Sequence, residues 1–517
     1  MPQDSPPAAR EAAPAPAPAP SLAKQVAKGA VWMVAIRFAS RTLGLISTLV
    51  IARILVPADF GLVAMATAFS TSVDALSEVG LREALIRHPE EARDLYDTAF
   101  TMQVLRGLLT GAVVALAAPF AARWFGERRL EPIFLVLAAL AVASGFENIA
   151  IVEFWRNFRF GMEFALQILP RLLQVAAAIV ASLMLHSYWA LIIAIAVSRL
   201  ARLVATYAVH PHRPRLALRR WRDLVGFSFW IWASSLTNQV WQRADAFIVA
   251  PVLGAATYGL FSLAWELGRL PVSEFIAPVG ASLFPGFAEA RRRGDEGTLA
   301  PMAVIAFLTM LAVPLAIAIS AAAGPVVLVL LGPRWLAARP LVSIIALSCG
   351  FAAVPWVSGA VLQVNGRVQR LFAVSAAGAA IRVLLYIHAA HQADVMALAW
   401  WAVASFALAA AAHAVALRVS GELRLREGLG CLVRTLLGSV VTVAALWATG
   451  WGWRADMPPD RLAALLDGAR IGIFVMIVFA LTTAFLWRLA GSPHGPESWL
   501  FSMLRPAVAR LRRAYPA

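Results

Sequence analysis

The sequence predicts an all-α integral membrane protein, because the chain is far more apolar than a soluble protein and its apolar residues come in long runs. Of the 517 residues, 61% are hydrophobic and only 14% are charged, and the mean hydropathy is +0.74. Soluble domains carry about 45–50% apolar and about 25% charged residues. A soluble protein of this composition would have an apolar surface, so we expect lipid to be its solvent. Disordered, collagen-like and disulfide-stapled chains are excluded by the same composition.

Long apolar runs give the number of predicted membrane spans. A transmembrane helix needs about 20 mostly apolar residues, and the breaks at charged residues, glycine and proline leave 14 such runs. They lie near 29–53, 58–80, 97–122, 131–154, 161–185, 188–209, 224–250, 257–284, 300–331, 339–364, 370–390, 394–418, 430–452 and 470–489.

The ends and the cysteines of the chain carry no further predicted chemistry. The first 20 residues are Pro/Ala-rich, which is typical of an extended, solvated tail and lacks the pattern of a signal peptide. The first apolar run, after Lys28, is therefore expected to remain as a membrane span. Cys349 and Cys431 both lie inside apolar runs, so we expect no structural disulfide.

Arginine dominates the charge of the chain and predicts its orientation. There are 45 Lys and Arg against 29 Asp and Glu, a net charge of +16. With the N-terminus in the cytoplasm, roughly 25 basic residues fall in cytoplasmic segments and about 7 in outer loops. Because basic residues concentrate in cytoplasmic loops, we expect both termini there. The charge alone would also suit nucleic acid, which we do not expect as a partner of a membrane-spanning chain.

A short internal repeat predicts two halves with the same orientation. The string IARILVPADFGLVAM at 51–65 aligns without gaps with VAPVLGAATYGLFSL at 249–263, a shift of 198 residues that places Gly61 on Gly259. Parallel repeats are related by an axis along the membrane normal, with the substrate site between them. We therefore expect two parallel six-helix bundles around a central cavity, plus two extra C-terminal helices.

Five segments follow from this organisation. They are a disordered Pro/Ala-rich cytoplasmic tail, an N-terminal six-helix bundle, a C-terminal six-helix bundle, two additional transmembrane helices and a basic cytoplasmic tail. Their predicted bounds are 1–24, 25–215, 216–420, 421–490 and 491–517.

Charges inside the predicted spans are candidate functional residues, since each costs at least ~2.5–3.5 kcal/mol near the bilayer centre. Arg37 and Arg41 lie one turn apart on the first helix, and Asp74 and Glu78 one turn apart on the second. Two interpretations remain open. The four side chains form ion pairs that hold two helices in register, or they face a water-filled cavity that accepts an anionic headgroup and a cation.

The seventh predicted helix is the most polar. Its segment TNQVWQRAD, at 237–245, cannot face lipid on all sides, because unsatisfied amides are costly there. It lines a cavity or an extended helix contact, and the cavity is the favoured interpretation. The candidate substrate-binding residues are Arg37, Arg41, Asn238, Gln239, Gln242 and Arg243. The candidate coupling-ion residues are Asp74, Glu78, Asp245 and Glu266.

Enzyme motifs are missing from the sequence. It has no Walker A, GxSxG or HExxH motif and no Cys/His metal cluster. No predicted outer loop exceeds about 20 residues, whereas a membrane polymerase or ligase needs room outside the bilayer for its acceptor. We therefore expect no enzyme activity, no cofactor and no metal.

Two motif strings, taken together, resemble a known family. ARILVPADFGLVAMATAF and RADAFIVAPVLGAATYGLFSLAWELGRLP are similar to the first hairpin and to the seventh and eighth helices of polysaccharide-type flippases. These oligosaccharide (Wzx-like) flippases belong to the multidrug/oligosaccharidyl-lipid/polysaccharide (MOP) exporter superfamily. The positions that match the ordered motif are Asp245, Gly254, Tyr258, Gly259, Phe284 and Pro285. The similarity covers roughly residues 21–420 and is greatest to the branch that exports lipid-linked exopolysaccharide or O-antigen units.

This resemblance implies a function. Family members move undecaprenyl-diphosphate-linked oligosaccharides across the bacterial cytoplasmic (inner) membrane, and membrane lipids and the polysaccharide polymerase or chain-length machinery are their expected partners. Arginine suits the diphosphate, because its planar donor fork matches phosphate oxygens. Alternatives within the superfamily are a flippase for the peptidoglycan lipid precursor and a drug/cation antiporter. A polysaccharide polymerase or ligase is the alternative from the enzyme class, and a structural scaffold is a further one.

Overall fold

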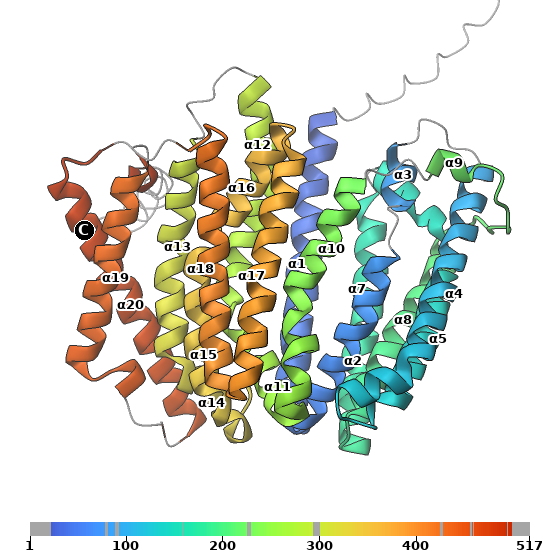
Figure 1. The fold of residues 1–517 in the computed structure, drawn as a ribbon, viewed down its shortest axis with the longest axis horizontal. Helices are drawn as coiled ribbons and strands as arrows, with labels where there is room; N and C mark the ends of the chain where they lie inside the picture. The colour runs from blue at the N-terminus through green and yellow to red at the C-terminus, as the bar shows by residue number, and fades with distance from the viewer. Residues whose placement is uncertain are drawn as a thin grey trace, which may run out of the picture.

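The computed structural model describes residues 22–77, 81–87, 93–157, 159–224, 229–292, 300–423, 428–454, 458, 460–493 and 495–498. All regular secondary structure in these residues is helical. The long helices stand side by side with their axes in broadly the same direction (Figure 1). Glu78, one of the candidate coupling-ion residues, lies outside the described residues.

The first half begins with two helices that carry candidate charges, α1 (Leu22–Ile51) and α2 (Pro57–Leu76). The long helices that follow are α4 (Arg93–Trp124), α5 (Leu130–Gly145), α7 (Phe160–Leu185) and α8 (Trp189–Val209). Short helices complete this half: α3 (Leu81–Arg87), η1 (Ile149–Val152), α6 (Glu153–Arg156) and α9 (Trp221–Leu224).

The second half repeats the opening hairpin with α10 (Phe229–Ile248) and α11 (Ala250–Gly268). A π-helical turn, η2 (Val272–Ile276), then leads into α12 (Ala277–Arg292). The remaining helices of this half are α13 (Pro301–Ala321), α14 (Ala323–Leu330), η3 (Pro333–Ala338), α15 (Arg339–Ala346), η4 (Leu347–Phe351), α16 (Ala353–Val364), α17 (Val368–Gln392) and α18 (Val395–Val419).

Two further helices, α19 (Leu429–Thr449) and α20 (Arg461–Leu489), follow the second half, joined by the short η6 (Gly452–Arg454). They pack against α13 and α14 and form the outer end of the row of helices in Figure 1. They lie away from the first half, in agreement with their having no counterpart in the repeat.

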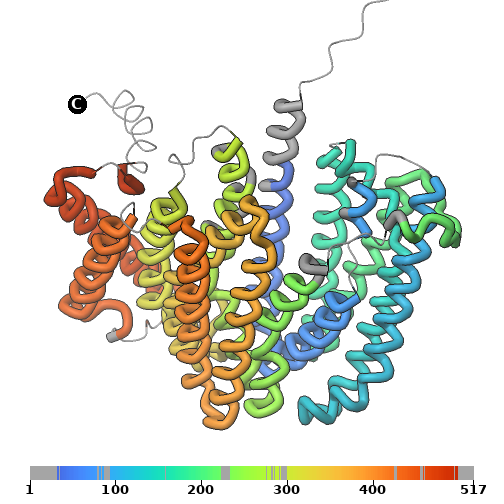
Figure 2. Tube along the Cα trace, turned by 45° about the horizontal axis from the view of Figure 1, so that its top comes forward, coloured from blue at the N-terminus to red at the C-terminus, as the bar shows by residue number. Residues whose placement is uncertain are grey.

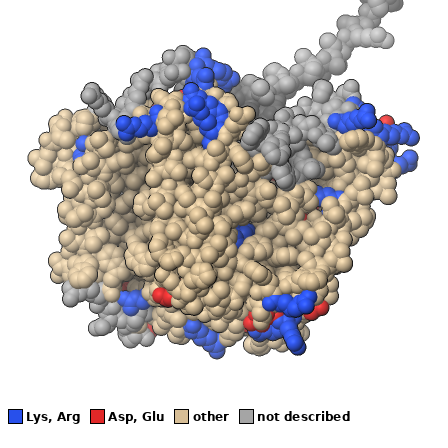
Figure 3. Space-filling model, viewed as in Figure 1, with Lys and Arg blue, Asp and Glu red and all other residues tan. Residues whose placement is uncertain are grey.

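The all-α, membrane-spanning class is confirmed. Nine described helices are long and apolar enough to cross a membrane, or up to 11 if each of two bent pairs is one span. Each of the 14 predicted intervals overlaps a described helix or a consecutive series of helices, although the interval 257–284 begins inside α11 and ends inside α12, and the count of 14 itself stays a prediction. Figure 3 shows a broad middle belt almost free of charged side chains, with arginines at both rims. Leu116 and Met184 are 75% and 76% exposed, as expected of side chains that face lipid.

The two copies of the sequence repeat meet where α2 crosses α11. A Cβ on Gly61 would lie 1.8 Å from the carbonyl oxygen of Ala255, and a Cβ on Gly259 would lie 1.9 Å from that of Pro57. Pro57 and Ala255 are themselves 198 residues apart, so the contact is reciprocal, as in a two-fold interface. Glycine is required at both positions because the two backbones touch.

The same end of the molecule is closed by further contacts between the halves. Trp335 donates its indole N–H to the carbonyl oxygen of Ala52 at 2.7 Å, and Arg53 donates to that of Val329 at 3.1 Å. Gly254, inside α11, has a φ of +75° and kinks this helix, and the axes of α10 and α11 differ by 97°. Figure 2 shows α2 (blue) and α11 (green) in the lower middle of the molecule, on the side away from the start of α1.

Gly61→Ala is expected to destabilise the protein, because the new methyl group collides with backbone rather than with a flexible side chain. Overpacking of this kind costs on the order of 1–3 kcal/mol. The measurement is the melting temperature of the purified protein in detergent. Gly472→Ala on α20 is the matched control, because a Cβ there meets nothing within 4 Å. Equal melting temperatures for the two variants would contradict the close crossing of α2 and α11.

Candidate functional site

Two cavities flank α1 and share Arg37 and Arg41 in their walls. The first, here called the N-half cavity, has a volume of about 910 Å³ and lies mainly among α1, α7 and α8. The second, the C-half cavity, has a volume of about 780 Å³ and lies among α10, α11, α12, α16 and α18. Both volumes lie in the range of ligand sites, roughly 300–1,000 Å³.

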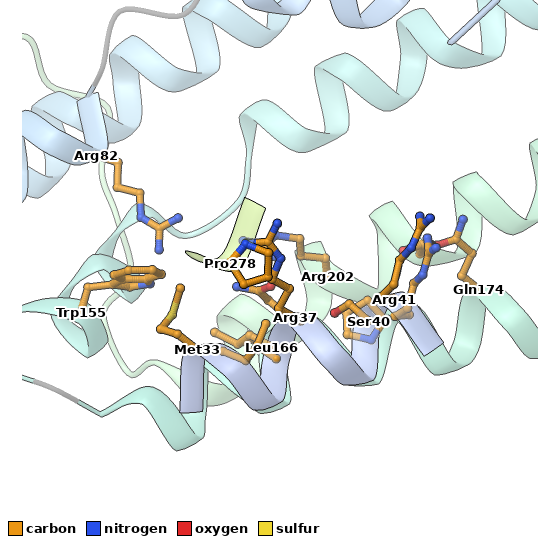
Figure 4. Close-up of a pocket in the computed structure, with 15 residues that line it drawn as sticks. Met33, Arg37, Ser40, Arg41, Arg82, Trp155, Leu166, Gln174, Arg202 and Pro278 are labelled. Carbon is orange, nitrogen blue, oxygen red and sulfur yellow. Dashed lines mark hydrogen bonds between the residues drawn. The ribbon is translucent and has the colours of Figure 1, made fainter. Parts of the chain in front are cut away.

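Arginine dominates the wall of the N-half cavity. Among the described wall residues there are five arginines and no carboxylate; the arginines are Arg37, Arg41, Arg82, Arg171 and Arg202. Figure 4 shows the guanidinium of Arg82 directed toward the ring of Trp155, 4.3 Å from its centroid. Arg82 and Arg202 have a carboxylate partner outside the wall, because Arg82 lies 3.5 Å from Glu163 and Arg202 lies 3.0 Å from Glu147. The chemistry of the wall suits an anion, since arginine binds phosphate and carboxylate oxygens in a planar fork.

Arg37 and Arg41 differ in what holds them. Arg41 forms ion pairs with two carboxylates of the second half: its Nε lies 2.8 Å from Glu274 Oε1, and its Nη1 lies 3.3 Å from Glu266 Oε1. Arg37 is exposed to the cavities and has no ion pair or hydrogen bond with any described residue. Arg41 therefore ties α1 to the second half, whereas Arg37 makes no such tie within the described part of the chain.

The C-half cavity combines aromatic rings with neutral polar groups. Its rings include Trp241, Trp265, Trp356 and Phe406, and its polar groups include Asn238, Gln242, Gln363 and His413. The imidazole of His413 is hydrogen-bonded to Ser358, since its Nδ1 lies 3.0 Å from the hydroxyl oxygen of that residue. Amides beside aromatic faces suit a ligand with many hydroxyls and apolar C–H surfaces.

The structure brings half of the candidate residues to the cavity walls. Four of the six substrate-binding candidates line a cavity, together with one coupling-ion candidate: Arg37, Arg41, Asn238, Gln242 and Glu266. The role of each as a site residue stays a prediction.

The remaining described candidates lie in helix contacts. Gln239 donates to Ser72 on α2 at 3.3 Å, and Asp245 accepts from the Tyr258 hydroxyl at 2.9 Å. Asp74 lies 4.0 Å from Arg199, and the Nε of Arg243 is buried without a hydrogen-bond partner in the described part of the chain. The polar segment of α10 was expected to line a cavity or to form a helix contact. It does both, since part of it lines the C-half cavity and part of it contacts neighbouring helices.

The sequence did not single out several residues of the cavity walls. Arg82, Arg171 and Arg202 approach α1 only through the packing of α3, α7 and α8, which no local pattern reveals. Arg41 pairs with Glu266 and Glu274 of the second half. The ion-pair interpretation of the sequence had instead expected carboxylates of the second predicted helix as its partners. The position of Arg171 inside an apolar run was a sequence signal for a functional residue, but such a signal does not predict which residues the side chain will contact.

Two helical halves related by a repeat, with cavities on both sides of α1, form an architecture that is typical of secondary transporters. The family model described as "Polysaccharide biosynthesis protein" matches residues 50–340, which is more than half of the chain. The chain therefore belongs to this polysaccharide biosynthesis family.

Two curated relatives and one solved structure show how far the similarity extends. The succinoglycan biosynthesis transport protein ExoT of Rhizobium meliloti is 25% identical over 65% of this chain and 70% of that protein. The teichuronic acid biosynthesis protein TuaB of Bacillus subtilis is 20% identical over 57% of this chain and 62% of that protein. The lipid II flippase MurJ, in an inward closed conformation, superimposes with a TM-score of 0.71 at 11% identity, over 89% of this chain and 99% of that one; this likeness concerns the fold.

A double-mutant cycle tests the difference between Arg41 and Arg37. Arg41→Gln and Glu274→Gln are each expected to lower the melting temperature, and the double variant to lower it by less than the sum, with a coupling of about 1 kcal/mol. Arg37→Gln is the matched control and should leave thermal stability unchanged, because no ion pair is lost. Strict additivity of the two Arg41–Glu274 changes would contradict a structural role for Arg41.

Proposed function

We propose that this protein is a flippase that moves undecaprenyl-diphosphate-linked oligosaccharide repeat units, destined for exopolysaccharide, O-antigen or capsule, across the cytoplasmic membrane. The observation that carries the proposal is the N-half cavity, whose described wall has five arginines and no carboxylate. Two of them, Arg37 and Arg171, have no carboxylate within ion-pair distance among the described residues, whereas the other three are paired with carboxylates outside the wall. A diphosphate carries several negative charges and cannot cross the hydrocarbon core unaided. A polar cavity in which guanidinium groups replace its water lowers that barrier.

Alternating access is the proposed mechanism. The α2–α11 crossing at Gly61 and Gly259 closes one end of the molecule, while the cavities lie along α1 toward its other end. Moving the substrate requires this crossing to open as the opposite end closes. We propose the N-terminus-inside orientation, which makes the closed end the outer one and the cavities accessible from the cytoplasm.

The two cavities differ in chemistry, and each is proposed to bind a different part of the substrate. Arg37 and Arg41 stand between the two cavities and are the proposed diphosphate ligands, with Arg82, Arg171 and Arg202 around them. Asn238 and Gln242 are the proposed partners of sugar hydroxyls. Glu266 is the coupling-ion candidate best placed in the cavities, because a phosphate that binds Arg41 would compete with this carboxylate.

A peptidoglycan lipid precursor flippase is the second candidate function, and the fold shared with MurJ favours it. Both candidates carry a polyprenyl diphosphate and use the same basic cavity. Essentiality separates them, since loss of the peptidoglycan precursor flippase is lethal. A drug/cation antiporter needs an acidic cavity, and the arginines around α1 argue against it. The similarity to a transport protein likewise favours a transporter over a polymerase or ligase.

A deletion strain complemented with variants tests the function. Without the protein, the lipid-linked repeat unit is expected to accumulate in the inner leaflet and the surface polysaccharide to disappear. Arg41→Ala should fail to restore export at normal membrane levels of the protein, because the diphosphate loses a charged partner worth about 1.5–3 kcal/mol. The measurements are surface polysaccharide by immunoblot and the lipid-linked pool by mass spectrometry.

Arg128→Ala is the matched control, because Arg128 is an exposed arginine outside both cavities and its loss should leave export intact. Unchanged polysaccharide and an unchanged lipid-linked pool in the deletion strain would overturn the proposed function. Full export by Arg37→Ala and Arg41→Ala alike would overturn the proposed diphosphate site while leaving the transporter in place.

A further inference from the structure

Two arginines enclose an aromatic wall of the C-half cavity. Arg269 lies 4.9 Å from the ring centroid of Trp265 and 4.5 Å from that of Phe406. Arg382, on α17, approaches the same two rings at 4.9 Å and 5.2 Å and also the ring of Trp241 at 4.5 Å. The rings therefore interact with two guanidinium groups through their π faces.

Neither arginine has a carboxylate partner within ion-pair distance among the described residues. Arg382 is fully buried, and its Nε and one Nη have no hydrogen-bond partner there; the Nε of Arg269 is also buried and unpaired. Asp245 is a countercharge to Arg382, although it is not within ion-pair distance, and it also accepts the hydrogen bond of the Tyr258 hydroxyl at 2.9 Å. Buried charges are ordinarily paired, so Arg269 is the member of the pair that lacks a nearby carboxylate among the described residues.

Arg269 is the member of the pair that a ligand can reach. It lines the C-half cavity, whereas Arg382 lies behind the wall and adds only its field. The carboxylate in the described wall of this cavity is Glu266, which is already engaged by Arg41. Arg269 is therefore a cation without a carboxylate partner among the described residues, and it lies on the aromatic side of the cavity, next to a proposed sugar site.

We propose that the C-half cavity is the oligosaccharide site and that Arg269 selects a glycan that carries a carboxylate, such as a uronic acid or an acid-bearing substituent. This inference rests on the proposed function. A guanidinium pairs with a carboxylate through two parallel hydrogen bonds, and in a low-dielectric cavity that pair is much stronger than in water. The diphosphate has its own arginines on the N-half side of α1, so the group that meets Arg269 belongs to the glycan.

The test compares one lipid-linked glycan in two forms. Undecaprenyl-diphosphate-linked oligosaccharide with one uronic acid, and the same compound with its carboxyl group reduced to the alcohol, are bound to the full-length protein in lipid nanodiscs. The wild-type protein is expected to bind the acidic form about tenfold more tightly, the effect of one charge-assisted hydrogen-bonded pair. In Arg269→Gln this ratio should fall to about one, and Arg269→Lys should restore part of it.

Arg470→Gln on α20 is the matched control. Arg470 also lies over a tryptophan, 4.3 Å from the ring of Trp451, but it lines neither cavity, so the ratio should stay at about ten. Equal binding of the two glycans by the wild-type protein would overturn the inference. Equal weakening of both glycans in Arg269→Gln would also overturn it, by assigning Arg269 to the diphosphate. Failure of the wild-type protein to bind either glycan would overturn the proposed function and the inference with it.

Discussion

The backbone contact between α2 and α11 is the constraint on which the rest of the structure depends. Gly61 and Gly259 bring two helices so close that any side chain would strike a carbonyl oxygen of the partner helix. The contact joins the halves at one end, and Trp335 and Arg53 reinforce it there. Around α1, where the cavities lie, the halves are joined instead by polar contacts such as the ion pairs of Arg41 with Glu266 and Glu274. Opening this end in a transport cycle would also separate buried side chains of one core, such as Leu62 of α2 and Phe261 of α11.

α1 is the second element on which the account depends, because it forms a wall common to both cavities. Its two arginines divide the tasks of structure and binding: Arg41 is paired with Glu266 and Glu274 of the other half, and Arg37 has no described partner. An anionic substrate that reached α1 would find a free cation first and a paired one a helical turn further on. Substrate binding and the contact between the halves are thereby connected through one side chain, which gives alternating access a physical cause.

The sequence predicted the helices well and the site only in part. Apolar run length locates membrane helices because lipid imposes both their length and their composition, and the repeat led to Gly61 and Gly259 because glycine was needed in both copies. The candidates on α1 and two amides of α10 reached the cavity walls, but Gln239 and Asp245 turned to helix contacts, since one polar face serves two neighbours. Arg82, Arg171 and Arg202 could not be foreseen, because their meeting with α1 is set by tertiary packing alone.

The central claim is that α1 and α10 border a water-filled space that is closed at the α2–α11 end, and the accessibility of introduced cysteines tests it most directly. In a background with Cys349 and Cys431 replaced, Ser40→Cys and Asn238→Cys should react with a membrane-impermeant thiol reagent added from the side on which α1 begins. They should not react when the reagent is added from the opposite side. Leu109→Cys, at a position 60% exposed on α4, should resist the reagent from both sides because it faces lipid. Protection of both wall positions from both sides would contradict the account.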